Sequence, residues 1–452
     1  MRATTHASRL RRALVGFAAP LIVAASAVGP AGVGVVTAAE PSNMVLVWNE
    51  NAINVIQGAA TATPPGLGHV PPMSPLDLAM VHGAIYDAVN AIDRGHQPYL
   101  HRLSAPSTAS MAAAVAQAAH DVLVGLVPVV PPAVKTRVDD MLTASLALID
   151  PGQARDDGVT IGAQAAVAML LARSTDGRFD TEPFPTSNEL GKWRLVPPLN
   201  ANVLGQFATV TPLTMKSNDQ FRTEGPIADL TSAAYAADFN EVKALGAQTG
   251  SSRTPSQTLL AGFVFANPIP YMNKGLRDIA TAQHLSTAQQ AMLFVRTSFA
   301  SADALIACWN DKAHWLAWRP QTAIRLAADD GNPDTTADPN WTSLFPTPGY
   351  PDQPSGYNCY TQGVWYSARL FFGTDNMSFS LSSPGAPLNL PTVPVSVPPS
   401  TRNYTRFSDV ARDTIEGRIL TGFHFRTADV AGAWIGKKVA QWIDKNYFEP
   451  VD

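Results

Sequence analysis

The chain has 452 residues, of which 46% are hydrophobic and 15% are charged, with 37 Pro and 31 Gly. This composition excludes a disordered tail protein, a collagen-like fibre and a coiled coil, and it allows one large core or two smaller ones. Four of the 32 basic residues lie in residues 1–39, which contain no acid, so the rest of the chain has 28 basic residues against 36 acidic ones. Such an acidic body binds nucleic acid poorly, and we expect no nucleic-acid partner.

Residues 1–39 are organised like a secretory signal peptide. A basic region ending in Arg11-Arg12 precedes an apolar run over residues 13–25, and small residues lead to Ala39. We therefore expect cleavage near Ala39, by the general or the twin-arginine route, and a secreted or extracytoplasmic protein. No later stretch reaches the ~18 uncharged apolar residues of a membrane span, so none is expected after signal removal. Export makes the two cysteines, Cys308 and Cys359, disulfide candidates.

The first half of the mature chain has a mainly helical pattern. Ser74-Pro75 predicts a helix with Ser74 as its N-terminal cap and proline in its first turn. Alanine-rich segments with helical periodicity follow at 109–127, 133–148 and 153–173. Residues 175–228 are richer in Pro, Asn and Thr, which predicts irregular connection and short helix.

Helical patterns resume in the second half. Helices are expected at 229–246 and 254–264, and a capping box at Ser286 and Gln289 opens a long helix that runs toward Trp309. A Ser/Pro-rich segment at 378–403 separates two further expected helices, at about 360–372 and about 406–421.

Lys312 and Arg319 are two cations in an otherwise apolar and aromatic segment. On a continuous helix their spacing would place both on one face, two turns apart, where they could converge on one anion. A solvated charged face is the ordinary alternative. It fits less well because the positions three and four residues from Lys312 offer no acidic partner and indicate burial: Cys308, Trp309, Trp315 and Leu316.

Two later segments offer groups for an anion. Ser355 and Gly356 stand where a helix is expected to begin, so a hydroxyl and free backbone N–H groups could form an oxyanion seat, although Pro-Ser-Gly is also an ordinary turn. Further on, Gly422 suits the end of a helix and leaves His424 on a connection, with Arg418 nearby. A lone histidine is more often structural, and the remaining histidines of the mature chain are interpreted that way.

The order of these segments is more specific than any one of them. Lys-x6-Arg-Pro, then Pro-Ser-Gly, then Arg-x3-Gly-x-His resembles the signature of the superfamily that unites the vanadium-dependent haloperoxidases and the type-2 phosphatidic acid phosphatases. Residues 45–49 and 79–90 look like the opening helices of its secreted bacterial branch. The resemblance implies an all-α fold of packed helical bundles, with residues 40–250 as the N-terminal bundle region and residues 251–452 as the C-terminal bundle that holds the oxyanion site.

The resemblance also implies a role for each site residue. Lys312, Arg319 and Arg418 would neutralise vanadate or phosphate, Ser355 and the Gly356 N–H would bond its oxygens, and His424 would bind vanadium or attack phosphorus. Preorganised cations and dipoles can stabilise a trigonal-bipyramidal centre, so one site can serve both chemistries.

Two positions depart from the family pattern. The family's usual acid comes four residues after the histidine, where this chain has Ala428, so Asp429 is the displaced candidate for orienting His424. The family's second histidine, which acts in proton transfer, is replaced by Tyr357. An unperturbed tyrosine has a pKa of about 10, against about 6.5 for histidine, so Tyr357 is a poor base at neutral pH. We expect oxyanion binding to survive this exchange better than turnover does.

Cys308 lies one helical turn before Lys312, and Cys359 lies one turn after Ser355. If Lys312 and Ser355 meet at one anion, the sulfurs become neighbours, and a disulfide would fix the two segments together.

Three functional interpretations follow. The first is an exported peroxidase that holds vanadate and uses hydrogen peroxide to oxidise halide or an organic substrate. The second is a phosphatase with a phospho-His424 intermediate, in which phosphate takes the place of vanadate. The third, motivated by Tyr357, is a weakly active oxyanion-binding protein. In each the partner is a small molecule, and the sequence leaves the oligomeric state open.

Overall fold

The computed structural model describes residues 41–451 except 101, 198–201 and 387–395. The predicted signal peptide therefore lies outside the described residues. The described residues belong to one compact unit, and the proposed boundary at residue 250 stays a prediction.

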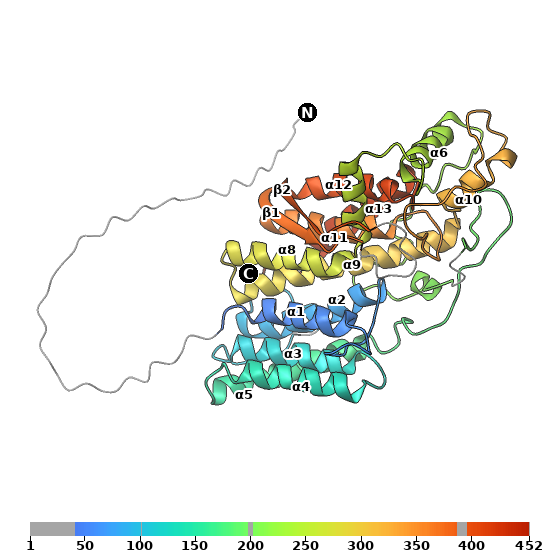
Figure 1. Cartoon of the computed structure of the whole chain (residues 1–452). Helices are drawn as coiled ribbons and strands as arrows, with labels where there is room; N and C mark the ends of the chain where they lie inside the picture. The colour runs from blue at the N-terminus through green and yellow to red at the C-terminus, as the bar shows by residue number, and fades with distance from the viewer. Residues whose placement is uncertain (1–40, 101, 198–201, 387–395, 452) are drawn as a thin grey trace, which may run out of the picture. The chain divides into compact units, whose positions relative to one another are not determined.

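The N-terminal helices pack against one another, and three of them are the predicted alanine-rich segments (Figure 1). Their bounds are α1 Met44–Gln57, α2 Met73–Asp93, α3 Met111–Gly125, α4 Pro132–Leu146 and α5 Gln153–Ala172. Helix α3 contacts α1, α2, α4 and α5, and its six alanines are all buried. The three predicted alanine-rich helices are confirmed to within about two residues at each end.

The predicted cap of α2 is wrong. The helix begins at Met73, two residues before the expected first residue Pro75, because the Ser74 amide already donates to the Val70 carbonyl. The Ser74 hydroxyl instead accepts a hydrogen bond from the Gln57 side chain, at 3.1 Å, and so joins α2 to α1.

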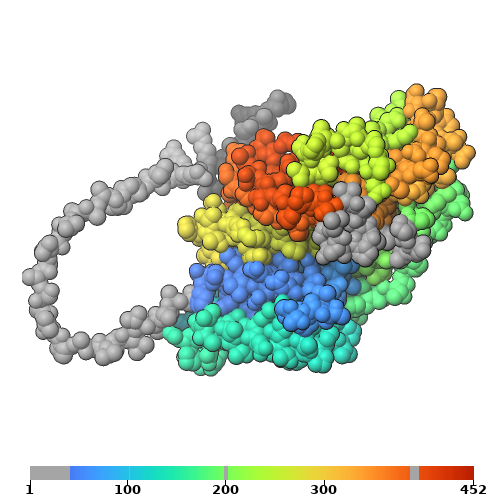
Figure 2. All heavy atoms as spheres, in the orientation of Figure 1, coloured from blue at the N-terminus to red at the C-terminus, as the bar shows by residue number. Residues whose placement is uncertain are grey.

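The second half of the chain is also mostly helical. It contains α6 Ala233–Gly246, α7 Pro255–Phe265, α8 Pro268–Ala282, α9 Thr287–Trp315, α10 Pro320–Arg325, α11 Gly356–Phe372, α12 Phe407–Leu420 and α13 Arg426–Asn446. The expected capping box of α9 is confirmed, with both reciprocal bonds between Ser286 and Gln289. Helix α8 was not predicted, and in the space-filling view the band that includes it lies between the N-terminal helices and the C-terminal ones (Figure 2).

Helix α9 is the centre of the described structure. It contacts α1, α2, α11 and α13. It is the one helix of the described residues long and apolar enough to cross a membrane, but 94% of its apolar window is buried inside the protein. The length and hydropathy of α9 are therefore those of a core helix, and helices from both halves of the chain pack against it.

A β-hairpin occupies part of the segment predicted as a Ser/Pro-rich separator. Strand β1 (Asn376–Ser383) pairs antiparallel with β2 (Ser400–Arg406), with Phe379 opposite Tyr404. Alternate residues of β1 are buried, and Phe379 stacks on Trp365 of α11. The sequence does not show this alternation of buried and exposed residues clearly, because serines stand at exposed positions and also at one buried position.

The irregular segment 175–228 is confirmed for its described residues, which exclude 198–201 and contain one short 3₁₀ helix, η1 (Gly205–Ala208). It is fixed to α9 by the buried carboxylate of Asp303. This carboxylate accepts hydrogen bonds from the backbone amides of Leu213, Thr214 and Met215, at 2.7, 2.8 and 3.2 Å, and from the Thr214 hydroxyl at 2.5 Å. One side chain thus replaces the ladder bonds that this segment lacks.

Removing that carboxylate should destabilise the fold strongly. We expect Asp303→Ala to lower the free energy of unfolding by about 3 to 5 kcal/mol, because it leaves several buried donors without an acceptor. Urea unfolding followed by circular dichroism measures the loss. The control is Asp140→Ala, which removes an exposed carboxylate of α4 and should change stability by less than about 0.5 kcal/mol. Equal effects of the two substitutions would contradict the proposed anchoring role.

Candidate functional site

Lys312 and Arg319 come together, but not on one helical face as predicted. Helix α9 ends at Trp315 because Leu316 adopts a left-handed conformation (φ 50°) and donates its amide to the Lys312 carbonyl. Arg319 therefore stands at the start of α10, on a new chain direction. Both side chains are 0% exposed, so the expected burial is confirmed while the helical geometry behind it is wrong.

A short loop surrounds these two cations. The ring of Tyr350 lies 5.2 Å from the Lys312 Nζ atom and 5.0 Å from the Arg319 Cζ atom. Lys312 donates to the carbonyls of Pro351 and Asp352, at 2.6 and 2.8 Å. Arg319 donates to the Tyr350 carbonyl at 2.9 Å. Burial lowers the pKa of Lys312 from 10.5 to about 8, so its charge is lost at a mildly alkaline pH.

Ser355 and Gly356 open α11, as expected. Ser355 is the N-cap residue and is fully buried, and Gly356 is the first helical residue. A side chain at Gly356 would lie 2.7 Å from the Trp309 ring, so only glycine fits against α9 there. The first amides of a helix have no acceptor within the helix, so this end of α11 presents donors among the site residues.

Arg418 lies near the end of α12, between two aromatic rings. Its Cζ atom is 4.9 Å from the centre of the Tyr357 ring and 4.6 Å from that of Phe423. The side chain makes one long hydrogen bond, of 3.4 Å, to the Val264 carbonyl. Within the described residues it has no carboxylate within ion-pair distance, and its Nε atom has no hydrogen-bond partner.

His424 follows the turn at Gly422, whose positive φ of 79° ends α12. The imidazole is 1% exposed. Its Nδ1 atom lies 2.6 Å from the Oδ1 atom of Asp352, and the Arg319 Nη1 atom lies 3.3 Å away. Burial, followed by the charges of Arg319, Arg418 and Lys312, lowers the pKa of His424 well below 6.5. A neutral imidazole bonded to a carboxylate donates its Nδ1 proton, which leaves Nε2 with a lone pair.

Asp429 does not orient His424, so that prediction is wrong. In the first turn of α13, its carboxylate accepts from the Asn358 amide group at 2.8 Å and from the Ser355 hydroxyl. The carboxylate on His424 belongs to Asp352, which sequence reasoning assigned no role. Burial raises the pKa of Asp352 to about 7 and that of Asp429 well above 3.8.

Tyr357 lies beside Arg418 and is bonded to another phenol. The hydroxyls of Tyr357 and Tyr271 are 2.5 Å apart. Burial raises the pKa of Tyr357 to about 12. The phenol therefore stays protonated at neutral pH and can donate a hydrogen bond, but it is an even poorer base than an exposed tyrosine.

The predicted disulfide is absent. Cys308 and Cys359 are both buried and free. Their thiols are hydrogen-bonded to one another, as expected for neighbours, and the Cys308 thiol also contacts the Pro354 carbonyl at 3.5 Å. Burial, followed by that thiol–thiol bond, raises the pKa of Cys359 well above 9.0. The two segments are held together by packing instead.

The predicted site residues thus gather in one buried cluster that fits an oxyanion. Three cations lie together with the carboxyl groups of Asp352 and Asp429, whose pKa values are raised by burial. Within the described residues, the Arg319 Nη2 and Arg418 Nε atoms are buried without a partner. Buried donors of this kind are costly unless something accepts from them, and a tetrahedral oxyanion would do so.

The cluster lies in a region related to known proteins. Residues 292–451 match the family described as the VCPO second helical-bundle domain. Vanadium chloroperoxidase of Curvularia inaequalis is 30% identical over 105 residues, which are 21% of this chain and only 16% of that protein.

Solved structures of bacterial enzymes share the fold. A vanadium-dependent iodoperoxidase has 19% identity and a TM-score of 0.69, over 91% of this chain and 97% of that one. A holo-type vanadium-dependent chloroperoxidase has 19% identity and a TM-score of 0.67, over 90% and 96%. The resemblance to the haloperoxidase superfamily and the mostly helical bundle fold are thus confirmed.

Oxyanion binding should weaken as the pH rises. Lys312, with its pKa lowered to about 8, loses its charge above that value, and Asp352, with its pKa raised to about 7, gains a negative charge above 7. Tungstate is a suitable probe because it stays a dianion over this range. We expect its affinity to fall by about tenfold or more between pH 6.5 and 9, measured by isothermal titration.

Two variants control that profile. Lys312→Met should bind tungstate weakly and lose the change above pH 8. Lys135→Met, which removes an exposed lysine of α4 paired with Asp139, should keep the profile of the unchanged protein. An affinity that rises with pH would contradict the assignment.

Proposed function

We propose that this chain, whose C-terminal part is a second helical bundle of the vanadium chloroperoxidase type, is an exported peroxidase that uses hydrogen peroxide to oxidise halide or an organic substrate. The observation that supports it most is the pair of buried guanidinium groups with unpartnered nitrogens, Arg319 and Arg418, beside a neutral histidine. The proposed partner is a small molecule, and the proposed export depends on residues 1–39.

Vanadate is the cofactor that this cluster would hold. Lys312, Arg319 and Arg418 would neutralise it, Ser355 and the Gly356 amide would bond its oxygens, and the Nε2 atom of His424 would be its protein ligand. When bound, vanadate supplies a Lewis-acidic centre that activates hydrogen peroxide toward attack by a halide.

The protein groups prepare that site in two ways. Asp352 holds the proton on the Nδ1 atom of His424 and so keeps the lone pair on Nε2. Full burial of Lys312 and Arg319 excludes water, which strengthens their attraction for an anion.

A phosphatase remains the second candidate, and the same Asp352–His424 contact favours it. A carboxylate that stabilises the Nδ1 proton makes Nε2 a better nucleophile. In that reaction the phosphorus of a phosphoester would bond to Nε2 as the alcohol leaves, and water would then release phosphate.

Low activity is the third proposal, and Tyr357 is its basis. A phenol with a pKa of about 12 cannot accept a proton at neutral pH, and losing a general acid–base costs ~10²- to 10⁴-fold in rate. In this proposal the protein binds the oxyanion well and turns over slowly.

One set of titrations separates the three proposals. We expect the purified mature protein to bind orthovanadate tightly and His424→Ala to bind it at least tenfold more weakly, since a charge-assisted site loses one ligand. Peroxide-dependent bromination on the same samples would support the peroxidase. Hydrolysis of a phosphoester without vanadate would favour the phosphatase.

Tyr357→His provides the complementary test. If bromination appears only in this variant, the natural protein is the weakly active form. If neither orthovanadate nor phosphate binds, the proposed function is wrong.

A further inference from the structure

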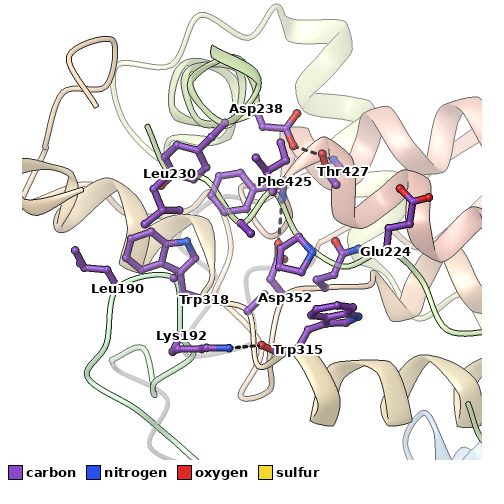
Figure 3. A pocket seen from close by; sticks show the side chains of 17 residues that line it. Leu190, Lys192, Glu224, Leu230, Asp238, Trp315, Trp318, Asp352, Phe425 and Thr427 are labelled. Atoms are coloured by element: carbon purple, nitrogen blue, oxygen red, sulfur yellow. Dashed lines mark hydrogen bonds between the residues drawn. The ribbon is translucent and has the colours of Figure 1, made fainter. Parts of the chain in front are cut away.

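A pocket adjoins the oxyanion cluster on the side of Trp318 and Phe425 (Figure 3). Trp318 directly precedes Arg319, and Phe425 directly follows His424, so the wall of the pocket is built on the same segments as the site. Asp352, which bonds His424, lines the pocket as well. Its volume is about 260 Å³, slightly below the ~300 Å³ lower bound of most ligand pockets, so it suits a small ligand.

The wall combines aromatic rings with carboxylates. Besides Trp318 and Phe425, the rings of Tyr235 and Trp315 line the pocket, together with the carboxylates of Asp238 and Glu224. Figure 3 shows several of these side chains around the pocket. Aromatic faces beside carboxylates are the surroundings in which proteins bind organic ammonium ions, because both attract a cation.

The carboxylates of the wall can accept further hydrogen bonds, and its one lysine is bonded to a backbone carbonyl. Asp238 accepts a hydrogen bond from the Thr427 amide at 3.0 Å, and its second oxygen has no partner among the described residues. Within the described residues the Glu224 carboxylate has neither a hydrogen bond nor an ion pair, and it is exposed. The one lysine of the wall, Lys192, donates to the Trp315 carbonyl at 3.2 Å.

Hydrogen-bonding groups of the wall are also unpartnered. The Trp315 Nε1 atom and the Tyr235 hydroxyl are buried and have no partner within the described part of the chain. Both residues line the pocket. They offer donors to a polar substituent on the aromatic body of a ligand.

A second pocket adjoins this wall. It shares Glu224, Asp238, Gln353 and Thr427 with the first pocket and also includes Trp434, which is 40% exposed. Its two arginines are already engaged. Arg426 pairs with Glu241 and Glu416, both at 2.7 Å, and Arg222 pairs with Asp311 at 3.3 Å. Glu224 and Asp238, which have no ion pair within the described residues, therefore outnumber Lys192, and the net charge around the two pockets is negative.

We propose that this pocket is the binding subsite for an organic substrate that has an aromatic body and an ammonium group. The rings would stack on the body, and Asp238 and Glu224 would attract the ammonium group at the side open to solvent. The inference deepens the proposed function, since it rests on the oxyanion cluster being the reaction centre next to this pocket. A negatively charged substrate would be repelled by the same carboxylates.

Three indole probes of nearly equal size test the proposal. Tryptamine has an ammonium group, indole-3-propionate has a carboxylate in the same place, and 3-methylindole has no charge. Isothermal titration into the mature protein should give tryptamine about tenfold higher affinity than either of the others. Equal affinities, or tighter binding of the carboxylate, would overturn the proposal.

Matched variants locate the effect. Glu224→Gln combined with Asp238→Asn keeps the shape of the wall, and it should reduce tryptamine affinity about tenfold while leaving 3-methylindole unchanged. Asp140→Asn, on an exposed carboxylate of α4 that lines neither pocket, should leave both affinities unchanged. Equal tryptamine affinity in the double variant would place the binding elsewhere and overturn the proposal.

The titrations also separate this proposal from the proposed function. Orthovanadate is titrated into the same unchanged protein. Tryptamine binding without orthovanadate binding would support the subsite and contradict the peroxidase. Orthovanadate binding without tryptamine binding would do the reverse.

Discussion

The contact between Asp352 and His424 organises the candidate site. Three cations are buried in this region, and buried charge is costly unless it is bonded. The loop at residues 350–352 supplies backbone carbonyls to two of them, Lys312 and Arg319, and places a carboxylate 2.6 Å from the imidazole of His424. This loop thereby links the end of α9, the start of α10 and the connection before α13. The same carboxylate decides which imidazole nitrogen remains available.

The convergence of the segments also requires close backbone packing. A side chain at Gly432 of α13 would lie 2.3 Å from the Ser355 carbonyl, so the start of α11 can approach α13 only at a glycine. In the same way, the absence of a side chain at Gly356 lets Trp309 of α9 pack against the start of α11. These contacts place Ser355 beside Asp429 and keep the N-terminus of α11 buried. The position of the seat therefore depends on Gly432, which no functional motif includes, as well as on Gly356 of the Pro-Ser-Gly segment.

The residues of the cluster were named from the resemblance to a known superfamily, and local patterns were sufficient only for the helices with clear caps or alanine-rich faces. They failed where distant contacts decide. Leu316 turns the chain between Lys312 and Arg319, and no periodicity in the sequence reveals this turn. The serine-rich sequence of β1 resembles a linker, and only the packing of Phe379 on Trp365 shows that it is a strand. Asp352 and His424 are 72 residues apart, so their contact leaves no local signal, whereas Asp429 was chosen only because it is near in sequence. The cysteines were correctly expected to be neighbours, but an even count and presumed export do not establish a bond.

The most direct test of this account is the protonation of His424, read from the ¹⁵N chemical shifts of its two ring nitrogens in ¹⁵N-histidine-labelled protein, with His424→Ala to assign the signals. The account predicts a neutral ring at pH 7, protonated at Nδ1 and bare at Nε2. It predicts that Asp352→Asn disturbs this pattern and that Asp429→Asn preserves it. A ring protonated at Nε2, or a pattern that depends on Asp429 and not on Asp352, would contradict it.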